Sequence, residues 1–200
     1  MKKLKEYFTY KFNLSDKVWD ILEIVMYCLI ALVIAWLIVT FVGQRTVVDG
    51  DSMYNTLSDG DNIIVEKLSY TFGSPDRYDI VVFPHYDENY GGNVYYIKRI
   101  IGLPGETIQI EDGLIYLIKD NGEKEILPDE YGYYYDGKPM NGYLASEPVT
   151  IPEGCYFVMG DNRNNSKDSR QIGVVKEDDI LGKAWLRFYP FGDFGFISHR

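Results

Sequence analysis

The hydrophobic pattern begins with one long apolar run near the N-terminus. Residues 24–42 are 19 positions without a charge. As a helix rising about 1.5 Å per residue, such a run crosses roughly 30 Å, the thickness of the hydrocarbon layer of a bilayer. Trp19 precedes the run at a depth typical of a membrane interface. The pattern therefore predicts a transmembrane anchor over residues 21–42, preceded by an N-terminal segment of residues 1–20.

Two other interpretations of this run fit the sequence less well. A cleaved signal peptide has a shorter apolar region followed by a site with small residues, such as Ala-x-Ala. Residues 40–44, TFVGQ, contain no such site, and the apolar run is long. A buried helix of a soluble protein is disfavoured by the length of the run. An uncleaved anchor is the expectation.

After the anchor the pattern changes to short β-branched and aromatic segments divided by turn signals. The fold class predicted for residues 43–200 is therefore mainly β, an antiparallel, partly closed domain with a loop-rich insertion at about 111–152. Asp112-Gly113 is a hairpin signal between two of these segments. The expected strands cover residues 46–48, 62–67, 79–83 (ending at Pro84), 94–101, 107–110, 114–118, 155–159 and 180–186.

Two aromatic stretches stand out in this domain. Residues 128–152 hold five tyrosines among Gly, Asp and Asn. They are interpreted as a solvent-facing excursion, with a tyrosine-lined peptide groove as the alternative. Residues 189–196, YPFGDFGF, are interpreted either as a strand end packed on the core or as an aromatic edge that touches lipid.

The charge distribution supports a membrane topology and excludes one function class. The net charge of −10 argues against nucleic-acid binding, which needs a basic surface. Residues 1–20 carry five lysines and a net charge of +2, whereas residues 43–200 carry −11. By the positive-inside rule, the N-terminus is expected in the cytoplasm and residues 43–200 outside it, in a single-pass cell-membrane protein.

The cysteines and histidines narrow the candidate chemistry. Cys28 lies in the anchor and Cys155 in the outer domain, so no internal disulfide is expected, and neither has a metal-ligand pattern. No metal or cofactor is predicted. His85 lies in an acidic segment and His199 near the C-terminus, neither in a triad-like setting.

Ser52 and Lys98 are the remaining candidate pair. A serine hydroxyl needs a base to remove its proton, and a lysine serves when burial disfavours its ammonium form. Ile97 and Lys98 point to opposite faces of a strand, so the neighbours of the amine must come from elsewhere in the fold. Taken alone, these features favour the interpretation of Ser52 as a turn serine and of Lys98 as a surface lysine of a strand.

Four segments change that balance. Residues 48–57, VDGDSMYNTL, resemble the nucleophile segment of bacterial type I signal peptidases, particularly the single-anchor form of Gram-positive bacteria. Residues 61–67 resemble the strand that follows it, residues 96–106 the lysine segment, and residues 160–170, GDNRNNSKDSR, the last family motif. Their order behind an N-terminal anchor makes the resemblance specific.

The resemblance implies a membrane-bound Ser/Lys endopeptidase that removes signal peptides from exported preproteins after an Ala-x-Ala-type site. Ser52 matches the nucleophile and Lys98 the general base. Ser166 matches a hydroxyl that orients the lysine amine, Asp168 and Arg170 match a supporting ion pair, and Asp161 belongs to the same loop. The positions that match small substrate pockets before the cut are Val48, Met53, Leu57 and Ile97. The partners implied are signal peptides, the lipid bilayer and a nearby secretion translocon.

Two residues depart from the pattern of the family. Many relatives have proline where this chain has Asn55, which either loosens the loop behind Ser52 or holds the turn through its own side chain. Gly50 stands where some relatives carry a hydroxyl for the oxyanion hole, which leaves the backbone N–H of Ser52 as the main donor. The alternatives left open are a catalytically weak or silent membrane-anchored binding module and a peptidase dedicated to one narrow substrate.

Overall fold

The structure is a computed structural model that describes residues 16–37, 43–88 and 90–198. The chain divides into two compact units, Met1–Val42 and Gly43–Arg200. The regular structure of the second unit is mainly antiparallel strands, and the described part of the first unit is an apolar helix. The predicted fold class, mainly β with an N-terminal apolar helix, is confirmed.

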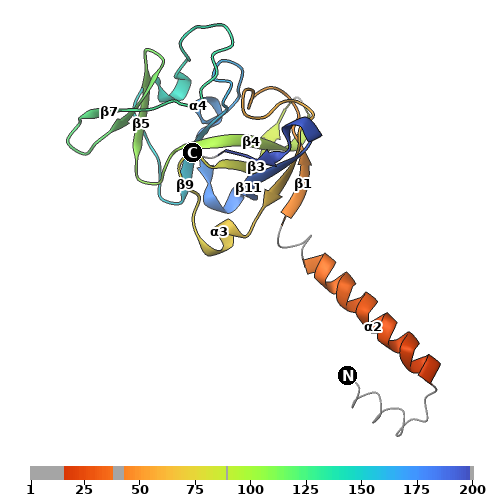
Figure 1. Cartoon of the computed structure of the whole chain (residues 1–200). Helices are drawn as coiled ribbons and strands as arrows, with labels where there is room; N and C mark the ends of the chain where they lie inside the picture. Colours follow the sequence, from red (N-terminus) through yellow and green to blue (C-terminus); the bar gives the residue numbers. More distant parts are fainter. Residues whose placement is uncertain (1–15, 38–42, 89, 199–200) are drawn as a thin grey trace. The chain divides into compact units, whose positions relative to one another are not determined.

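The apolar helix is α2, Asp16–Leu37, shown in Figure 1 in orange and red. Within it, Lys17–Leu37 has a mean hydropathy of 2.3, and none of its most apolar window is buried in the structure. A soluble core helix would bury one face, so this exposure disfavours that interpretation. By length and composition the helix is able to cross a bilayer. The end of the predicted anchor, residues 38–42, and the N-terminal lysines before residue 16 lie outside the described residues.

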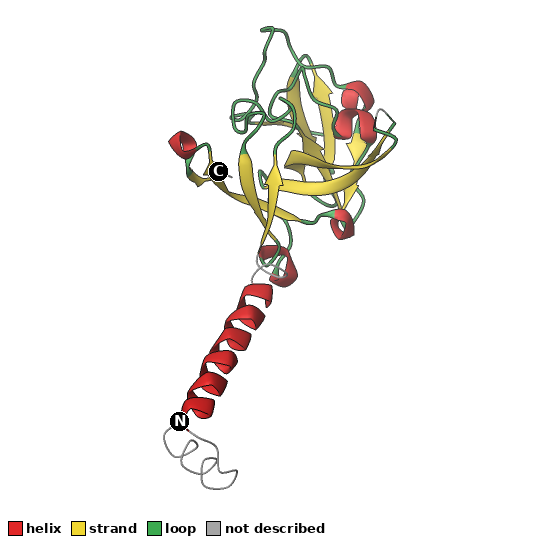
Figure 2. Ribbon diagram, turned by 90° about the vertical axis from the view of Figure 1, so that its right-hand side faces the viewer, coloured by secondary structure: helices red, strands yellow, loops and turns green. Residues whose placement is uncertain are grey.

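The larger sheet forms the centre of the second unit (Figure 1). Its strand order is β1-β2-β11-β3-β4-β9-β10, with β12 paired to β11, and all pairs are antiparallel. Figure 2 shows its long strands curving around the domain. The strands are β1 Gly43–Val47, β2 Asn62–Glu66, β3 Ile80–Asp87, β4 Gly92–Gly102, β9 Cys155–Met159, β10 Val175–Lys176, β11 Gly182–Tyr189 and β12 Gly195–Phe196.

Strand β3 continues past Pro84, where the sequence pattern predicted its end. Pro84 pairs with Tyr95 of β4, and the hairpin runs on to Asp87 and Gly92. On its other side, β3 pairs with β11 only at Val81 and Val82. From Phe83 onward that side is an edge within the described sheet, and an edge strand tolerates a residue without an N–H donor.

The smaller sheet belongs to the segment predicted as an insertion. Its order is β7-β6-β5-β8, from β5 Thr107–Glu111, β6 Leu114–Ile118, β7 Lys124–Leu127 and β8 Val149–Thr150. The β5–β6 hairpin turns at Asp112 and Gly113, both with positive φ (52° and 79°). Two consecutive left-handed residues are what a tight two-residue hairpin requires, so the hairpin signal is confirmed.

Three further elements are single turns of helix: α3 Ser69–Phe72, α4 Ser169–Ile172 and the 3-10 turn η2 Tyr143–Ser146. Short 3-10 turns η3 Glu177–Asp179 and η4 Phe191–Asp193 flank β11. None was predicted, because four residues are too few to show a helical period.

Both faces of the larger sheet are covered. Along β3, Ile80 and Val82 join one apolar cluster, whereas Val81 and Phe83 join another. Alternate residues of a strand point to opposite faces, so this run of buried residues reflects packing on both sides. A third cluster lies between the smaller sheet and β9, centred on Ile108, Ile115 and Phe157.

The two aromatic stretches differ in burial. In the tyrosine-rich stretch, Tyr131, Tyr133 and Tyr134 are partly buried against the loop that follows β9, whereas Tyr135 and Tyr143 are exposed. A solvent-facing excursion thus describes only part of it. At the C-terminal edge the side chains of Phe191, Phe194 and Phe196 are 61–80% exposed, so they do not pack on the core.

We expect Gly182→Ala to destabilise the domain. An added Cβ at Gly182 would lie 2.2 Å from the backbone oxygen of Glu66, at the β2–β11–β3 junction. The backbone must then shift, which we expect to cost about 2 kcal/mol and to lower the melting temperature by about 4–8 °C. The measurement is thermal unfolding of the full chain in detergent. The control is Gly192→Ala, because a Cβ at Gly192 meets no atom within 4 Å. Equal melting temperatures for the two variants would contradict the tight junction.

Candidate active site

Ser52 lies in a tight turn that follows β1. Backbone N–H groups of Thr56 and Leu57 both donate to the Met53 carbonyl, at 3.0 and 2.9 Å. The side chains of Met53 and Leu57 are buried in the core, with at most 1% exposed. These two anchors fix the turn on the domain. Ser52 itself stays partly exposed at its surface.

Lys98 lies in the middle of β4, and its side chain reaches the turn that carries Ser52. Its Nζ atom lies 2.8 Å from Ser52 Oγ and 2.8 Å from the Ile97 carbonyl oxygen. The Lys98 side chain is buried, with 4% exposed, and Nζ lies 5.0 Å from the centre of the Tyr96 ring. The structure therefore brings together the two residues that the sequence singled out. Tyr96 lies two residues before Lys98 on the same face of β4, and Ser52 comes from a distant part of the chain.

The electrostatics of Lys98 are set by burial. Burial lowers the pKa of Lys98 to about 8, against the opposing effect of the Asp168 and Asp161 carboxylates, which raise it. Within the described residues Lys98 makes no ion pair. A lysine with this pKa is neutral in a substantial fraction of molecules near pH 8, and only the neutral amine accepts a proton.

The loop after β9 supports the site from the other side. Its Gly160 N–H donates to Asp168 Oδ2 at 3.0 Å. Asp168 in turn forms a paired contact with Arg170, with Nε–Oδ1 at 2.8 Å and Nη2–Oδ2 at 2.7 Å. Both side chains are fully buried. The predicted Asp168–Arg170 ion pair thus exists, and it acts on the loop by fixing the Gly160 peptide.

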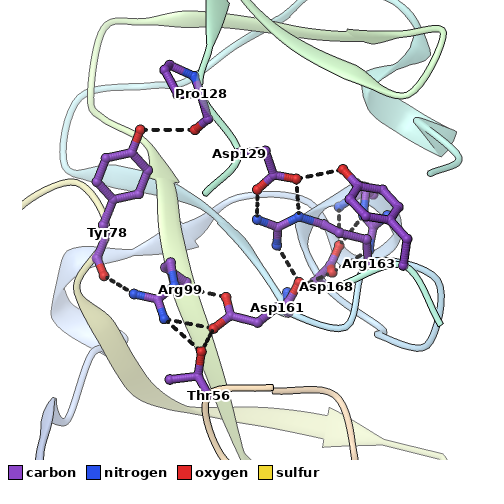
Figure 3. Close-up of polar contacts among 11 residues, drawn as sticks. Thr56, Tyr78, Arg99, Pro128, Asp129, Asp161, Arg163 and Asp168 are labelled. Atoms are coloured by element: carbon purple, nitrogen blue, oxygen red, sulfur yellow. Dashed lines mark hydrogen bonds and ion pairs between the residues drawn. The ribbon is translucent and has the colours of Figure 1, made fainter. Parts of the chain in front are cut away.

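A second buried pair joins the loop to β4. Arg99 contacts Asp161 through Nε–Oδ1 at 2.8 Å and Nη2–Oδ2 at 2.7 Å, and both are fully buried (Figure 3). Thr56 Oγ1 also donates to Asp161 Oδ2 at 2.6 Å. Asp161 therefore ties three segments together: the turn that carries Ser52, the strand that carries Lys98 and the loop after β9.

A third pair links the loop to the tyrosine-rich segment. The Arg163 guanidinium binds both carboxylate oxygens of Asp129 and also donates to the Gly160 carbonyl (Figure 3). Tyr134 donates its hydroxyl to Asp129 at 2.7 Å. Burial alone would raise the pKa of Asp129, but the hydrogen bonds and charge of Arg163 outweigh it and lower the pKa. Residue Gly160 is thus held at both its backbone N–H and its backbone C=O.

The loop touches the Ser52 turn directly. Asn162 donates its backbone N–H to the Ser52 carbonyl at 3.0 Å and its side-chain amide to the Asp51 carbonyl at 3.1 Å. A Cβ at Gly160 would lie 2.5 Å from the Ser52 carbonyl oxygen. A glycine is needed here because the two backbones approach too closely for any side chain.

Ser166 and the four predicted pocket residues behave differently from expectation. Ser166 Oγ is buried and has no hydrogen-bond partner among the described residues, so the expected contact to the lysine amine is not formed in this structure. Val48, Met53, Leu57 and Ile97 do lie together in one apolar cluster, but none is more than 7% exposed. Their assignment as substrate pockets stays a prediction.

Asn55 adopts a backbone conformation that proline cannot. Its φ is 86°, in the left-handed region, whereas the proline ring fixes φ near −65°. Asparagine is one of the few residues with a side chain that tolerates this region. The departure from the family pattern therefore fits the turn of this chain, and the idea that Asn55 loosens the loop finds no support in the geometry. Gly50 also has φ 86°, which disfavours a side chain there.

Sequence reasoning missed the partners that hold the site: Arg99, Thr56, Asn162, Arg163 and Asp129. One signal was available, because Arg99 sits inside an apolar strand and a charge there must be paired when buried. Of the histidines, His85 lies on β3 with its ring 4.9 Å from that of Tyr96, and His199 is outside the described residues. Within the described residues, no cluster of His, Cys, Asp and Glu is suited to hold a metal ion.

Sequence comparisons with known proteins agree on one family. The sequence model described as "Signal peptidase, peptidase S26" matches residues 21–189. A probable signal peptidase I-1 from Synechocystis sp. is 35% identical over 86% of this chain and 87% of its own length. Signal peptidase I from Bacillus caldolyticus is 42% identical, over 78% of this chain and 85% of its own length. A crystal structure of a signal peptidase I from Enterococcus faecalis is 32% identical and covers 55% of this chain and 95% of its own, with a TM-score of 0.40.

The left-handed turn at Asn55 leads to a prediction with an internal control. We expect Asn55→Pro to lower the melting temperature by about 4 °C or more, because the new residue cannot adopt φ 86° without moving the turn that carries Ser52. Asn55→Gly should leave the melting temperature within about 2 °C, since glycine accepts this φ freely. Thermal unfolding of both variants in detergent tests this. A stable Asn55→Pro variant would show that the turn adopts another conformation.

Proposed function

The chain belongs to the signal peptidase family, peptidase S26, and on that premise we propose that it cuts signal peptides from exported preproteins with Ser52 as nucleophile and Lys98 as general base. Membership makes the chain a serine endopeptidase of the signal peptidase I type, as predicted. The observation that carries the proposed mechanism is the 2.8 Å contact between Lys98 Nζ and Ser52 Oγ. That distance lies within the reach of direct proton transfer.

The reaction begins with neutral Lys98. Its amine takes the proton of Ser52 Oγ as that oxygen attacks the carbonyl carbon of the scissile bond. The resulting oxyanion needs donors, and the Ser52 backbone N–H has no hydrogen-bond partner within the described residues. The Lys98 ammonium then returns its proton to the leaving amine, and the C–N bond breaks to give an ester on Ser52. Lys98 next deprotonates a water that hydrolyses this ester, which restores the free serine.

The buried carboxylates assist the step in which Lys98 is charged. Burial favours the neutral amine, which is the form that starts the reaction, while Asp168 and Asp161 favour the ammonium. Because these two effects oppose each other, the pKa of Lys98 is about 8, and the amine can both accept and donate a proton at working pH. Each carboxylate is in turn paired with an arginine, Asp161 with Arg99 and Asp168 with Arg170.

Substrate selection before the cut would rest on Val48, Met53, Leu57 and Ile97. They lie together in one buried apolar cluster, and a pocket formed there would take small side chains, as an Ala-x-Ala type of site requires. One added methylene changes binding by only about 1–3 kcal/mol, so large residues would be rejected by steric exclusion. The proposed chemistry needs no metal or cofactor, because Lys98 performs each proton transfer.

The membrane arrangement is part of the same proposal. The apolar helix and the family of the chain indicate a membrane-anchored protein. We place residues 1–20 in the cytoplasm, residues 21–42 in the bilayer and residues 43–200 outside, following the lysine-rich N-terminus. A preprotein leaving a nearby translocon would share this surface with the enzyme. Confinement to one surface raises the effective concentration of substrate.

The central test is cleavage of a preprotein with Ala-x-Ala before the cut by the full chain in detergent. We expect Ser52→Ala and Lys98→Ala each to lower kcat/KM by at least about 1,000-fold, because each removes a group that takes part in bond breaking. The controls are Ser58→Ala, which lies in the same region, and Lys176→Ala, an exposed lysine on β10. Both should match the wild type. Full activity of Lys98→Ala would reject the Ser/Lys mechanism, and an inactive wild type would favour a silent module or a narrow substrate.

The pKa of Lys98 predicts the pH dependence of that reaction. Because neutral Lys98 is the active form, kcat/KM should rise with pH and level off above about 8. Below that pH it should fall roughly tenfold per unit as the amine becomes protonated. A pH series from acidic to mildly alkaline conditions, with a check that the chain stays folded, measures this. A profile that stays flat through pH 8 would mean that Lys98 is not the titrating base.

A further inference from the structure

A second recess opens next to the Ser52 turn, outside the four predicted pocket residues. It is a cavity of about 530 Å³ lined by residues that include Asp51, Tyr54, Tyr133, Tyr135, Asn162 and Asn164. Asp51 directly precedes Ser52 and Tyr54 follows it by two positions. The cavity therefore adjoins the turn that carries Ser52. Its size is that of a site for a short peptide segment.

The walls of this cavity are joined rigidly to one another. Tyr133 donates its backbone N–H to the Asp161 carbonyl at 2.7 Å and accepts from the Arg163 N–H at 2.9 Å. The rings of Tyr54 and Tyr133 meet edge to face at 4.9 Å. The side-chain amide of Asn164 donates to Asp136 Oδ1 at 2.6 Å, which joins the loop after β9 to the tyrosine-rich segment. The tyrosine-rich segment, the Ser52 turn and the loop after β9 thus form one preformed recess.

The chemistry of the walls suits an extended peptide. The asparagine amides offer donors and acceptors of the kind that a peptide backbone pairs with. The buried Asn162 side chain has an amide oxygen without a hydrogen-bond partner among the described residues. Tyrosine rings add contact area at a low cost in side-chain entropy. Among the described residues that line the recess, Asp51 is the one with a charge, and the charge is negative.

We propose that this cavity binds the residues of the preprotein that follow the scissile bond, and that Asp51 and Tyr135 there select among mature N-termini. The inference rests on the proposed function. A peptide extended over Ser52 leaves it in two directions at about 3.3 Å per residue. One direction is assigned to the pockets of Val48, Met53, Leu57 and Ile97, none of which lines this cavity. The other leads past Asp51 into the recess, within the first few residues after the cut.

The test compares two substrates with the same Ala-x-Ala segment, one ending a single residue after the cut and one extending about six residues further. Tyr135 is 72% exposed, so Tyr135→Ala removes a ring of the recess without opening the core. We expect Tyr135→Ala to lower kcat/KM about 5-fold for the long substrate and to leave the short one unchanged. Tyr90→Ala, a tyrosine 70% exposed in the β3–β4 turn, is the matched control and should affect neither.

A charge series addresses Asp51. In the long substrate, Lys at the third residue after the cut should be cleaved at least about 5-fold faster than Glu, given the Coulomb attraction of a nearby carboxylate. The ratio should fall to about 1 in Asp51→Asn. A Lys to Glu ratio near 1 in the wild type, or equal effects of Tyr135→Ala on long and short substrates, would overturn the inference while leaving the proposed function intact. If the wild type cuts neither substrate, the proposed function fails and this inference with it.

Discussion

The buried arginines impose the constraint on which the rest of the structure depends. Arg99, Arg163 and Arg170 are each at most 1% exposed, and a buried guanidinium is strongly unfavourable unless a carboxylate meets it with good geometry. Each has such a partner, in Asp161, Asp129 and Asp168. Removing one partner of a buried pair costs about 3–5 kcal/mol. The loop after β9 therefore has little freedom, and it holds the carbonyl of Ser52 in one place.

The same arrangement separates two kinds of positive charge that are adjacent in sequence. Lys98 and Arg99 are neighbours on β4, and strand geometry sends their side chains to opposite faces. Arg99 is paired with Asp161. Lys98 faces Ser52 and the Tyr96 ring, with no carboxylate in contact among the described residues. A fixed cation and an amine that readily loses its proton thus coexist one residue apart, because alternation gives each its own surroundings.

The sequence predicted the parts of the fold that depend on local pattern. The apolar helix, the long β4 run and the Asp112–Gly113 hairpin each have a period or a turn signal within a few residues. The family motifs indicated that Ser52 and Lys98 meet. The ion pairs escaped prediction because they join residues far apart, such as Arg99 with Asp161 and Arg163 with Asp129. The continuation of β3 through Pro84 could not be predicted from the sequence, because proline is tolerated there only on account of the missing neighbour strand on one side of β3 in the described sheet.

The burial of Lys98 also sets how the domain responds to alkali. The unfolded chain keeps its proton on this amine up to about pH 10.5, whereas the folded chain releases it near pH 8. Between these values the unfolded state binds more protons, so Lys98 makes the free energy of unfolding rise with pH. Below pH 8, Lys98 is protonated in both the folded and the unfolded state. The folded state then bears the whole free-energy cost of burying the ammonium group, on the order of 3 kcal/mol. At neutral pH the domain is therefore less stable than its packing alone would make it, and it approaches that limit only in alkaline solution.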